Sequence, residues 1–309
     1  MFEIDLTKYL KRGYKFDKVN DIKINGKNYI FKLLPRDESY NHNFDHFYND
    51  LIINEICKKI GIECCDIYLA KYKKRYGTLV ENYKTIANAK YINGAAILRE
   101  YFDYLERNHL ISECLDEPLD YPLNENYKEF IIKKMNNLET IWDALNYHYR
   151  NFPDSKRNKI VEKIMDELTT RYSLDYLVLQ ADRNAKNWEI IETKDDAYLT
   201  PLFDNELSFW FDLYIPELKV DINDKLKFSG ELEKYLSFSS EYFKEKFIKL
   251  YNILTPDFLE NIIKQLEMEN DFTFPVLYKK ELLENYIKYY NDIANTFVKI
   301  ENKRWYCAR

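Results

Sequence analysis

Glycine is scarce in this chain, with 6 residues among 309. A phosphate-binding loop needs closely spaced glycines, and the sequence offers one weak candidate, Arg12-Gly13-Tyr14-Lys15. Histidine is rarer still, with 4 residues, and none lies beside a serine or cysteine nucleophile motif, so hydrolysis by a catalytic triad has no support. His42 and His46 have i, i+4 spacing, but the only further ligand nearby in sequence is Asp45, which points elsewhere, so we interpret them as surface or capping residues rather than a metal site.

Long apolar runs and basic blocks are also missing. No apolar run approaches the length of a membrane span, and residues 1–16 lack the apolar core of a secretory signal, so we expect neither a membrane span nor a signal peptide. The net charge is −6, from 46 basic and 52 acidic residues, which argues against direct nucleic-acid binding and against anionic membrane surfaces. Five cysteines without the spacing of a disulfide scaffold or a zinc site indicate a reduced, cytoplasmic protein.

What the sequence does contain is typical of an α+β fold in two parts. Residues 1–83 have the pattern of a small sheet with one crossing helix, and residues 84–309 are mostly helical in pattern. Asn25-Gly26 stands between two alternating apolar runs and predicts a two-residue β-hairpin. A helix that ends at Gly61 and two strands are expected next, at about residues 44–60, 66–72 and 77–83.

The helical part has one polar interruption. An apolar stripe at four-residue spacing predicts a helix that leads into the polar segment 181–187. The members of the stripe are Ile160, Ile164 and Leu168. A short hairpin around residues 194–196 is expected next, and it ends at Asp204. Farther along, Thr255-Pro256-Asp257 has the cap and first-turn residues of a helix, so the tail is predicted to be helical.

The polar segment and the hairpin carry the candidate catalytic residues. Asp182 and Asn187 form a D-x-x-x-x-N loop, and Asp204 ends the apolar run after the hairpin. Because a hairpin brings its two ends together, we expect Asn187 and Asp204 to face one site. Hard Mg²⁺ prefers carboxylate and amide oxygens and leaves its other positions to water and phosphate. This order of elements favours a metal–phosphate site over the alternative, in which Asp182 merely ends a helix and Asp204 forms a turn.

Lys32 and Glu55 are the candidates from the N-terminal part. Lys32 shares a strand face with Ile30 and Leu34, so its ammonium needs an anionic partner from protein or ligand, unless it lies at an edge and reaches water. Glu55 stands on the packed side of the predicted helix and is the expected partner of Lys32. The competing interpretation pairs Glu55 with Lys59, one helical turn away.

These segments resemble the HipA-like serine/threonine kinases. Two motifs of that family are matched, a D-x-x-x-K-N loop by Asp182, Lys186 and Asn187, and a T-P-x-x-D strand end by Thr200, Pro201 and Asp204. Residues 53–72 resemble the family's helix and the strand after it, and residues 77–83 resemble the strand that enters the hinge. The resemblance spans about residues 11–210.

The resemblance implies a two-lobed kinase fold, with a β-rich lobe over residues 1–83, a helical lobe over residues 84–309, and ATP and Mg²⁺ between them. The roles that it implies are Asp182 as catalytic base or substrate orienter, Lys32 as the phosphate-binding residue held by Glu55, Asn187 and Asp204 as ligands of Mg²⁺, and the backbone of Glu81, Asn82 and Tyr83 beside adenine.

The expected activity is transfer of phosphate from ATP to a protein serine or threonine, by a toxin or effector component with a separate antitoxin or regulatory partner. Such a protein acts in the cytoplasm, or in a host cell if it is delivered there. Residues 1–38 contain no serine, so the family's inactivation through a phosphorylated serine in this region does not transfer to this chain.

Two other functions stay open. A small-molecule or lipid kinase is one, because Asp182-Arg183 also resembles the loop of phosphatidylinositol kinases, although this chain has Asn184 where they have histidine. The other is a pseudokinase that binds nucleotide and acts through its helical tail, which the weak phosphate loop favours and the presence of Asp182, Asn187 and Asp204 opposes.

Overall fold

The computed structural model describes residues 4–8, 19–33, 45–72, 75–84, 88–111, 127–180, 183–209, 241–270 and 273–307. The chain forms two compact units. The first draws on Met1–Tyr83, Tyr172–Ala181 and Asp204–Arg309, and the second on Lys84–Arg171 and Asp182–Phe203. The boundaries of these two units differ from those of the two lobes expected from the sequence, because the units are defined by contacts within the chain. The lobe boundaries therefore stay a prediction.

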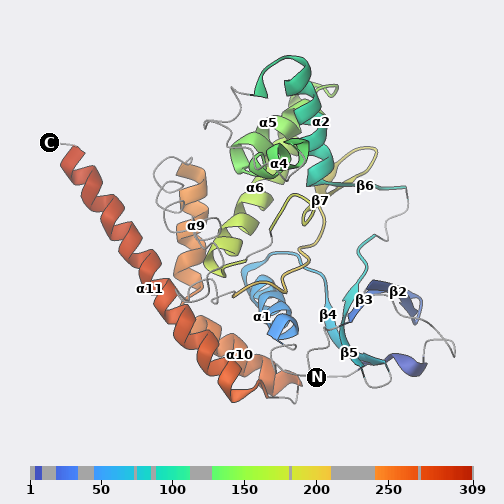
Figure 1. Ribbon diagram of the computed structural model, residues 1–309, viewed down its shortest axis with the longest axis vertical. Coiled ribbons are helices and arrows are strands. Elements are labelled where there is room, and N and C mark those ends of the chain that lie inside the picture. The colour runs from blue at the N-terminus through green and yellow to red at the C-terminus, as the bar shows by residue number, and fades with distance from the viewer. Residues whose placement is uncertain are drawn as a thin grey trace. The chain divides into compact units, whose positions relative to one another are not determined.

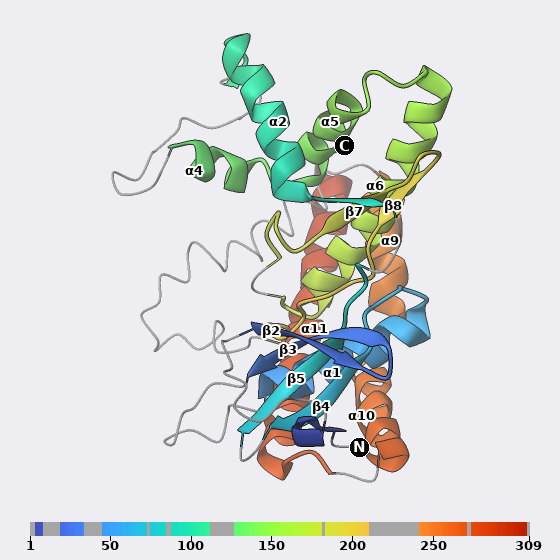
Figure 2. The same ribbon diagram turned by 90° about the vertical axis from the view of Figure 1, so that its right-hand side faces the viewer.

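A five-stranded sheet lies beside α1 in the first unit (Figures 1 and 2). Its strands, in the order β1-β4-β5-β3-β2, are β1 (Ile4–Asp5), β4 (Ile67–Tyr72), β5 (Arg75–Glu81), β3 (Lys27–Leu33) and β2 (Val19–Ile24). β1 runs parallel to β4, and the other neighbours are antiparallel. A short 3-10 helix, Leu6–Lys8, follows β1.

The β2–β3 hairpin turns at Asn25 and Gly26, as the sequence predicts. Both residues have a positive φ, 50° and 87°, and Ile24 pairs with Lys27 across the turn. This backbone is the type I′ turn, whose twist matches that of the two strands. The turn fixes the register of β3, and therefore the face on which each of its side chains lies.

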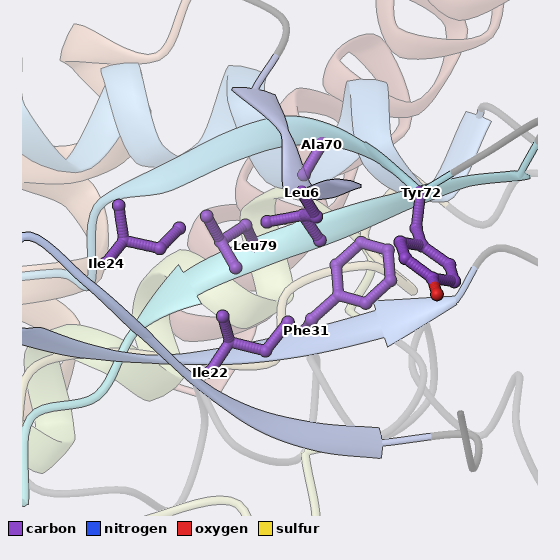
Figure 3. Close-up of a cluster of buried hydrophobic side chains, with 7 residues drawn as sticks. All are labelled: Leu6, Ile22, Ile24, Phe31, Ala70, Tyr72 and Leu79. Atoms are coloured by element: carbon purple, nitrogen blue, oxygen red, sulfur yellow. The ribbon is translucent and has the colours of Figure 1, made fainter. Parts of the chain in front are cut away.

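A cluster of buried side chains covers one face of the sheet (Figure 3). Its members are Leu6, Ile22, Ile24, Phe31, Ala70, Tyr72 and Leu79. Phe31 is fully buried in this cluster. Because side chains alternate along a strand, Lys32 lies on the opposite face.

Helices complete the first unit: α1 (Asp45–Ile60), α9 (Glu241–Ile253), α10 (Pro256–Asn270) and α11 (Val276–Cys307). α1 contacts β4 and α10, and α10 lies along α11 (Figures 1 and 2). Gly61, with φ +79°, ends α1, and the Ile62 N–H donates to the Cys57 carbonyl. The Thr255 hydroxyl accepts from the Phe258 N–H and caps α10, so both helix-end predictions are confirmed.

The second unit pairs a three-stranded sheet with helices. Its elements are β6 (Lys90–Asn93), β7 (Glu189–Glu192), β8 (Ala197–Leu199), α2 (Gly94–Arg107), α4 (Tyr127–Lys134), α5 (Leu138–His148) and most of α6 (Asp154–Leu177). The predicted hairpin is β7–β8, and the predicted apolar stripe of α6 is buried. Across the described ranges, every helix is too short or too polar to cross a membrane.

Candidate functional site

Lys32 and Asp204 form an ion pair in the first unit. The Lys32 ammonium donates to Asp204 Oδ1 at 2.5 Å, although the two residues are 172 positions apart in the chain. Burial lowers the pKa of Lys32, but the carboxylates of Asp204 and Glu206 raise it more, so this pKa lies above its ordinary value. Lys32 therefore stays charged, and the anionic partner expected from the sequence is a carboxylate of the protein.

Asp204 begins a tight turn that ends at Phe209. Its φ is +61°, in the left-handed region that aspartate tolerates better than most residues. Gln180, just after α6, donates from Nε2 to the Asp204 carbonyl at 3.1 Å, and the Phe209 N–H donates to the Val178 carbonyl at 2.6 Å. Both ends of this segment, which we call the Asp204 turn (residues 204–209), are thus held by the chain that follows α6.

One face of α1 holds the same turn through three polar side chains. Asn49 Nδ2 donates to the carbonyls of Glu206, at 3.2 Å, and Ser208, at 2.7 Å. His46 Nδ1 lies 3.1 Å from the Glu206 carbonyl oxygen. The Asp50 carboxyl accepts the Asn205 N–H at 3.0 Å. Spacing of i, i+3 and i+4 puts these side chains on one face of α1.

Asp50 is the most perturbed acid of this group. It is 5 % exposed, and burial together with the Glu206 carboxylate raises its pKa to about 8, although Lys32 acts to lower it. The carboxyl is therefore mostly protonated at neutral pH, yet its Oδ1 still accepts the Asn205 N–H. The carboxyl groups of Asp204, Glu206 and Asp50 all act on the Lys32 ammonium.

Glu55 has partners other than Lys32. Its carboxylate lies 3.8 Å from Lys59 Nζ and accepts from Gln265 Nε2 at 3.5 Å. The predicted Lys32–Glu55 pair is therefore not formed, and the competing interpretation, a pair with Lys59, describes the structure. The physical reason is the place of the Asp204 turn, which lies against the face of α1 that carries Asp50 and supplies Lys32 with a nearer carboxylate.

Glu81 is the last residue of β5, and Asn82 and Tyr83 come directly after it. The N–H of Glu81 donates to the Asp66 carbonyl, and the N–H of Asn82 donates to the Asn28 carbonyl. The Glu81 side chain pairs with Lys27 at the surface. These two N–H groups are committed to the protein, so an adenine base at this strand would use other backbone groups of residues 81–83.

Asn187 belongs to the second unit, where a compact loop places it next to Trp188. The Asn184 side chain accepts the Lys186 N–H, and the Asn187 N–H donates to the Asn184 carbonyl. Arg183 Nη1 donates to the carbonyls of Asn187, at 3.3 Å, and Phe203, at 2.9 Å. The guanidinium thus ties the loop to the end of the β7–β8 hairpin, and Asn187 is 8 % exposed.

Some predicted residues lie outside the described residues: Asp182, His42 and the loop candidate Arg12-Gly13-Tyr14-Lys15. Their roles stay predictions, as does a shared metal site of Asn187 and Asp204. Within the described ranges, no three or more His, Cys, Asp or Glu side chains are grouped to hold a metal ion.

The sequence reasoning missed Asn49 and Asp50, and it placed His46 at the surface or in a cap. A signal was present for Asp50, because it stands three residues before Ile53 and seven before Cys57, on the buried stripe of α1. An acidic residue on an apolar stripe needs a partner in the core. His46, one turn before Asp50, and Asn49, directly before it, extend this polar face.

The fold is similar to that of a solved kinase. The crystal structure of the Helicobacter pylori proinflammatory kinase CtkA matches with a TM-score of 0.57 and 13% sequence identity, over 98% of this chain and 99% of that chain. This chain has a kinase-like fold. The two-lobed kinase fold expected from the sequence is thereby confirmed at the level of the fold.

Other comparisons add less. The HipA toxin of Shewanella oneidensis MR-1, solved with HipB and operator DNA, matches with a TM-score of 0.48 and 15% identity, over 92% of this chain and 67% of that chain. No protein-family model matches the sequence, and no curated protein matches it significantly.

Proposed function

We propose that this protein is an ATP- and Mg²⁺-dependent phosphotransferase, and that it is a HipA-like protein serine/threonine kinase. The observation that supports this most is the Lys32–Asp204 pair at 2.5 Å, on a chain with the fold of a kinase. An ammonium on a strand and a carboxylate on a turn are the two charges that a nucleotide phosphate and its metal ion require.

Each residue has a defined part in this proposal. Lys32 binds phosphate oxygens, and Asp204 and Asn187 are metal ligands. Asp182 orients the hydroxyl of the acceptor, and the backbone of residues 81–83 binds adenine. Bound Mg²⁺ would neutralise charge that develops on the transferred phosphoryl group. Lys32, which pairs with Asp204 in this structure, would be available to phosphate if that carboxylate held the metal.

The acceptor and the partner follow from the sequence resemblance. We propose a serine or threonine of a protein as acceptor, and a separate antitoxin or regulatory protein as partner, in the cytoplasm or in a host cell. A small-molecule or lipid kinase is favoured only by Asp182-Arg183, and a pseudokinase only by the scarcity of glycine.

Labelled ATP with Mg²⁺ tests this proposal, with the protein alone and with cell lysate. We expect a thermal shift with ATP and Mg²⁺, equivalent to about 2.7 kcal/mol when the ligand is at 100 times its Kd. Phosphate transfer should fall by about 100-fold or more in Lys32→Ala and Asp204→Asn, since each removes a charge at the phosphates or the metal. Lys27→Ala is the matched control, because Lys27 forms an exposed ion pair on the same strand.

The outcomes separate the alternatives. Neither shift nor transfer in the wild-type protein would overturn the proposal. Transfer into lipid extract rather than protein would favour the lipid kinase. A shift without transfer to any acceptor would favour the pseudokinase.

A further inference from the structure

Asn49 joins three parts of the first unit. Its Nδ2 donates to the Glu206 and Ser208 carbonyls of the Asp204 turn, and its Oδ1 accepts the Tyr278 hydroxyl of α11 at 2.7 Å. Both ends of the amide are therefore used, and they point to different elements. A continuous path of hydrogen bonds runs from α11 through α1 to the turn that begins with Asp204.

The α11 end of this path is fixed by packing that does not depend on the hydroxyl. The Tyr278 ring lies 5.1 Å from that of Tyr48 and 5.9 Å from that of Phe274, measured between centroids. Phe274 is fully buried and its N–H donates to Glu267. Burial holds the pKa of Tyr278 well above its ordinary value, so the hydroxyl keeps its proton and stays a donor.

The turn end of the path bears on the proposed metal ligand. Asn49 bonds the second and fourth residues after Asp204, and Asp204 itself has a left-handed backbone. Gln180 and Val178 hold the other side of this turn. A turn clamped from both sides can place a carboxylate to within a fraction of an ångström, and losing one clamp lets that carboxylate move.

We infer that Asn49 and Tyr278 are positioning residues through which α11 sets the place of the Asp204 carboxylate. The inference rests on the proposed function, because it assigns to α11 control over the metal-binding step of that function. A purely structural role would predict a loss of stability alone. A positioning role predicts in addition a higher requirement for Mg²⁺.

Two variants interrupt this path of hydrogen bonds at different points. Tyr278→Phe keeps the ring and its packing and deletes the hydroxyl. Asn49→Asp keeps the shape but replaces the two N–H donors by an oxygen that faces two carbonyls. Tyr286→Phe is the matched control, because it deletes another buried α11 hydroxyl that also donates at 2.7 Å, but to the Leu254 carbonyl.

The measurements are the melting temperature and the Mg²⁺ concentration that gives the half-maximal thermal shift with ATP. Removing a group that orients a metal ligand costs about 10-fold in metal affinity, so we expect a rise of about 10-fold in that Mg²⁺ concentration for Tyr278→Phe and at least as much for Asn49→Asp. Tyr286→Phe should lose similar stability with an Mg²⁺ requirement within about 2-fold of wild type.

Each result is decisive. If Tyr278→Phe and Tyr286→Phe need the same Mg²⁺ concentration while the wild type responds to ATP, the inference is wrong and the proposed function stands. If the wild type itself shows no response to ATP and Mg²⁺, the proposed function fails, and this inference fails with it. Should Asn49→Asp not fold, the comparison of the two tyrosine variants still decides.

Discussion

Three carboxyl groups surround the Lys32 ammonium. Asp204 takes the ion pair, Glu206 adds its charge, and buried Asp50 keeps its proton with a pKa of about 8. A protonated acid is the less costly form where a second and third negative charge would be buried. At the scale of single residues, Lys32 therefore faces two carboxylates, and the proton on Asp50 prevents a third negative charge.

The proton on Asp50 gives a prediction about pH. Because its pKa is raised from 3.8 to about 8, the folded protein holds a proton that the unfolded chain releases over this range. The free energy of unfolding must then fall as pH rises from about 4 to about 8, and Asp50→Asn removes this loss while keeping an acceptor for the Asn205 N–H.

Melting temperatures of both proteins at about pH 5, 7 and 9 check this prediction. The variant should gain on the wild type by about 1.4 kcal/mol for each pH unit between pH 5 and pH 8, which makes about 4 kcal/mol at the top of the range. Parallel curves for the two proteins would show that Asp50 is ionised in the folded state throughout.

Residue-scale prediction from the sequence succeeded for Lys32 and failed for Glu55. The strand pattern was enough to show that Lys32 needs an anion. It could not say which carboxylate pairs with Lys32, because the partner is Asp204, 172 positions away, and not Glu55 on α1.

Elements that form locally were predicted well. The β2–β3 hairpin, the end of α1 at Gly61 and the start of α10 at Thr255 follow from residues in direct sequence neighbourhood. The register of the sheet needs more, because β3 lies between β2 and β5, and β5 comes later in the chain.

Gly77 shows how tightly β5 lies against β3. A Cβ at this position would be 2.3 Å from the Lys32 carbonyl oxygen and 2.4 Å from the Phe31 ring. We expect Gly77→Ala to destabilise the protein by about 1–3 kcal/mol, as overpacking does in closed cores. Urea unfolding measures this. Gly26→Asn is the comparison, because its cost would come from the backbone φ of +87° and not from packing, since no atom lies within 4 Å of a Cβ there. Equal stability of Gly77→Ala and wild type would contradict the packing described for this sheet.

His148 links three elements of the second unit. Its Nδ1 lies 2.6 Å from Glu100 of α2, and its Nε2 lies 3.0 Å from Glu192 of β7. Burial lowers the pKa of His148, but these two carboxylates raise it more, so the net shift is upward, while the pKa values of both glutamates are lowered. Arg150 shares Glu100, which strengthens the cluster.

The sign of these shifts sets a pH window. The stability from charged His148 is complete below about pH 6.5 and is lost as pH rises through its folded pKa, and that from the glutamates is lost below about pH 4.5. His148→Gln should therefore cost most between these limits, on the order of 1 kcal/mol because the groups are partly exposed. Melting temperatures of the variant and the wild type at about pH 5.5 and 8.5 test this. A loss of stability in the variant that is unchanged at the higher pH would exclude a charged His148.

At the scale of the whole molecule, the fold is shared with a kinase although few residues are. An identity of 13% over 98% of the chain leaves the arrangement of elements recognisable while most core side chains differ. Cores accept many combinations of apolar residues if pattern and volume are kept. The fold was nevertheless predicted from the sequence, because that prediction used a few motif residues and the order of the elements rather than the identity of the core.

By itself the sequence determined the hairpin, the helix ends, the apolar stripes and the candidate acids, because these depend on residues a few positions apart. Only the tertiary structure decided that Lys32 meets Asp204, that Asp50 rather than Glu55 faces the Asp204 turn, and that Asn49 ties this turn to Tyr278. These contacts join residues far apart in the chain. They form only when helix faces, strand register and turn geometry are fixed together, and no local pattern encodes that combination.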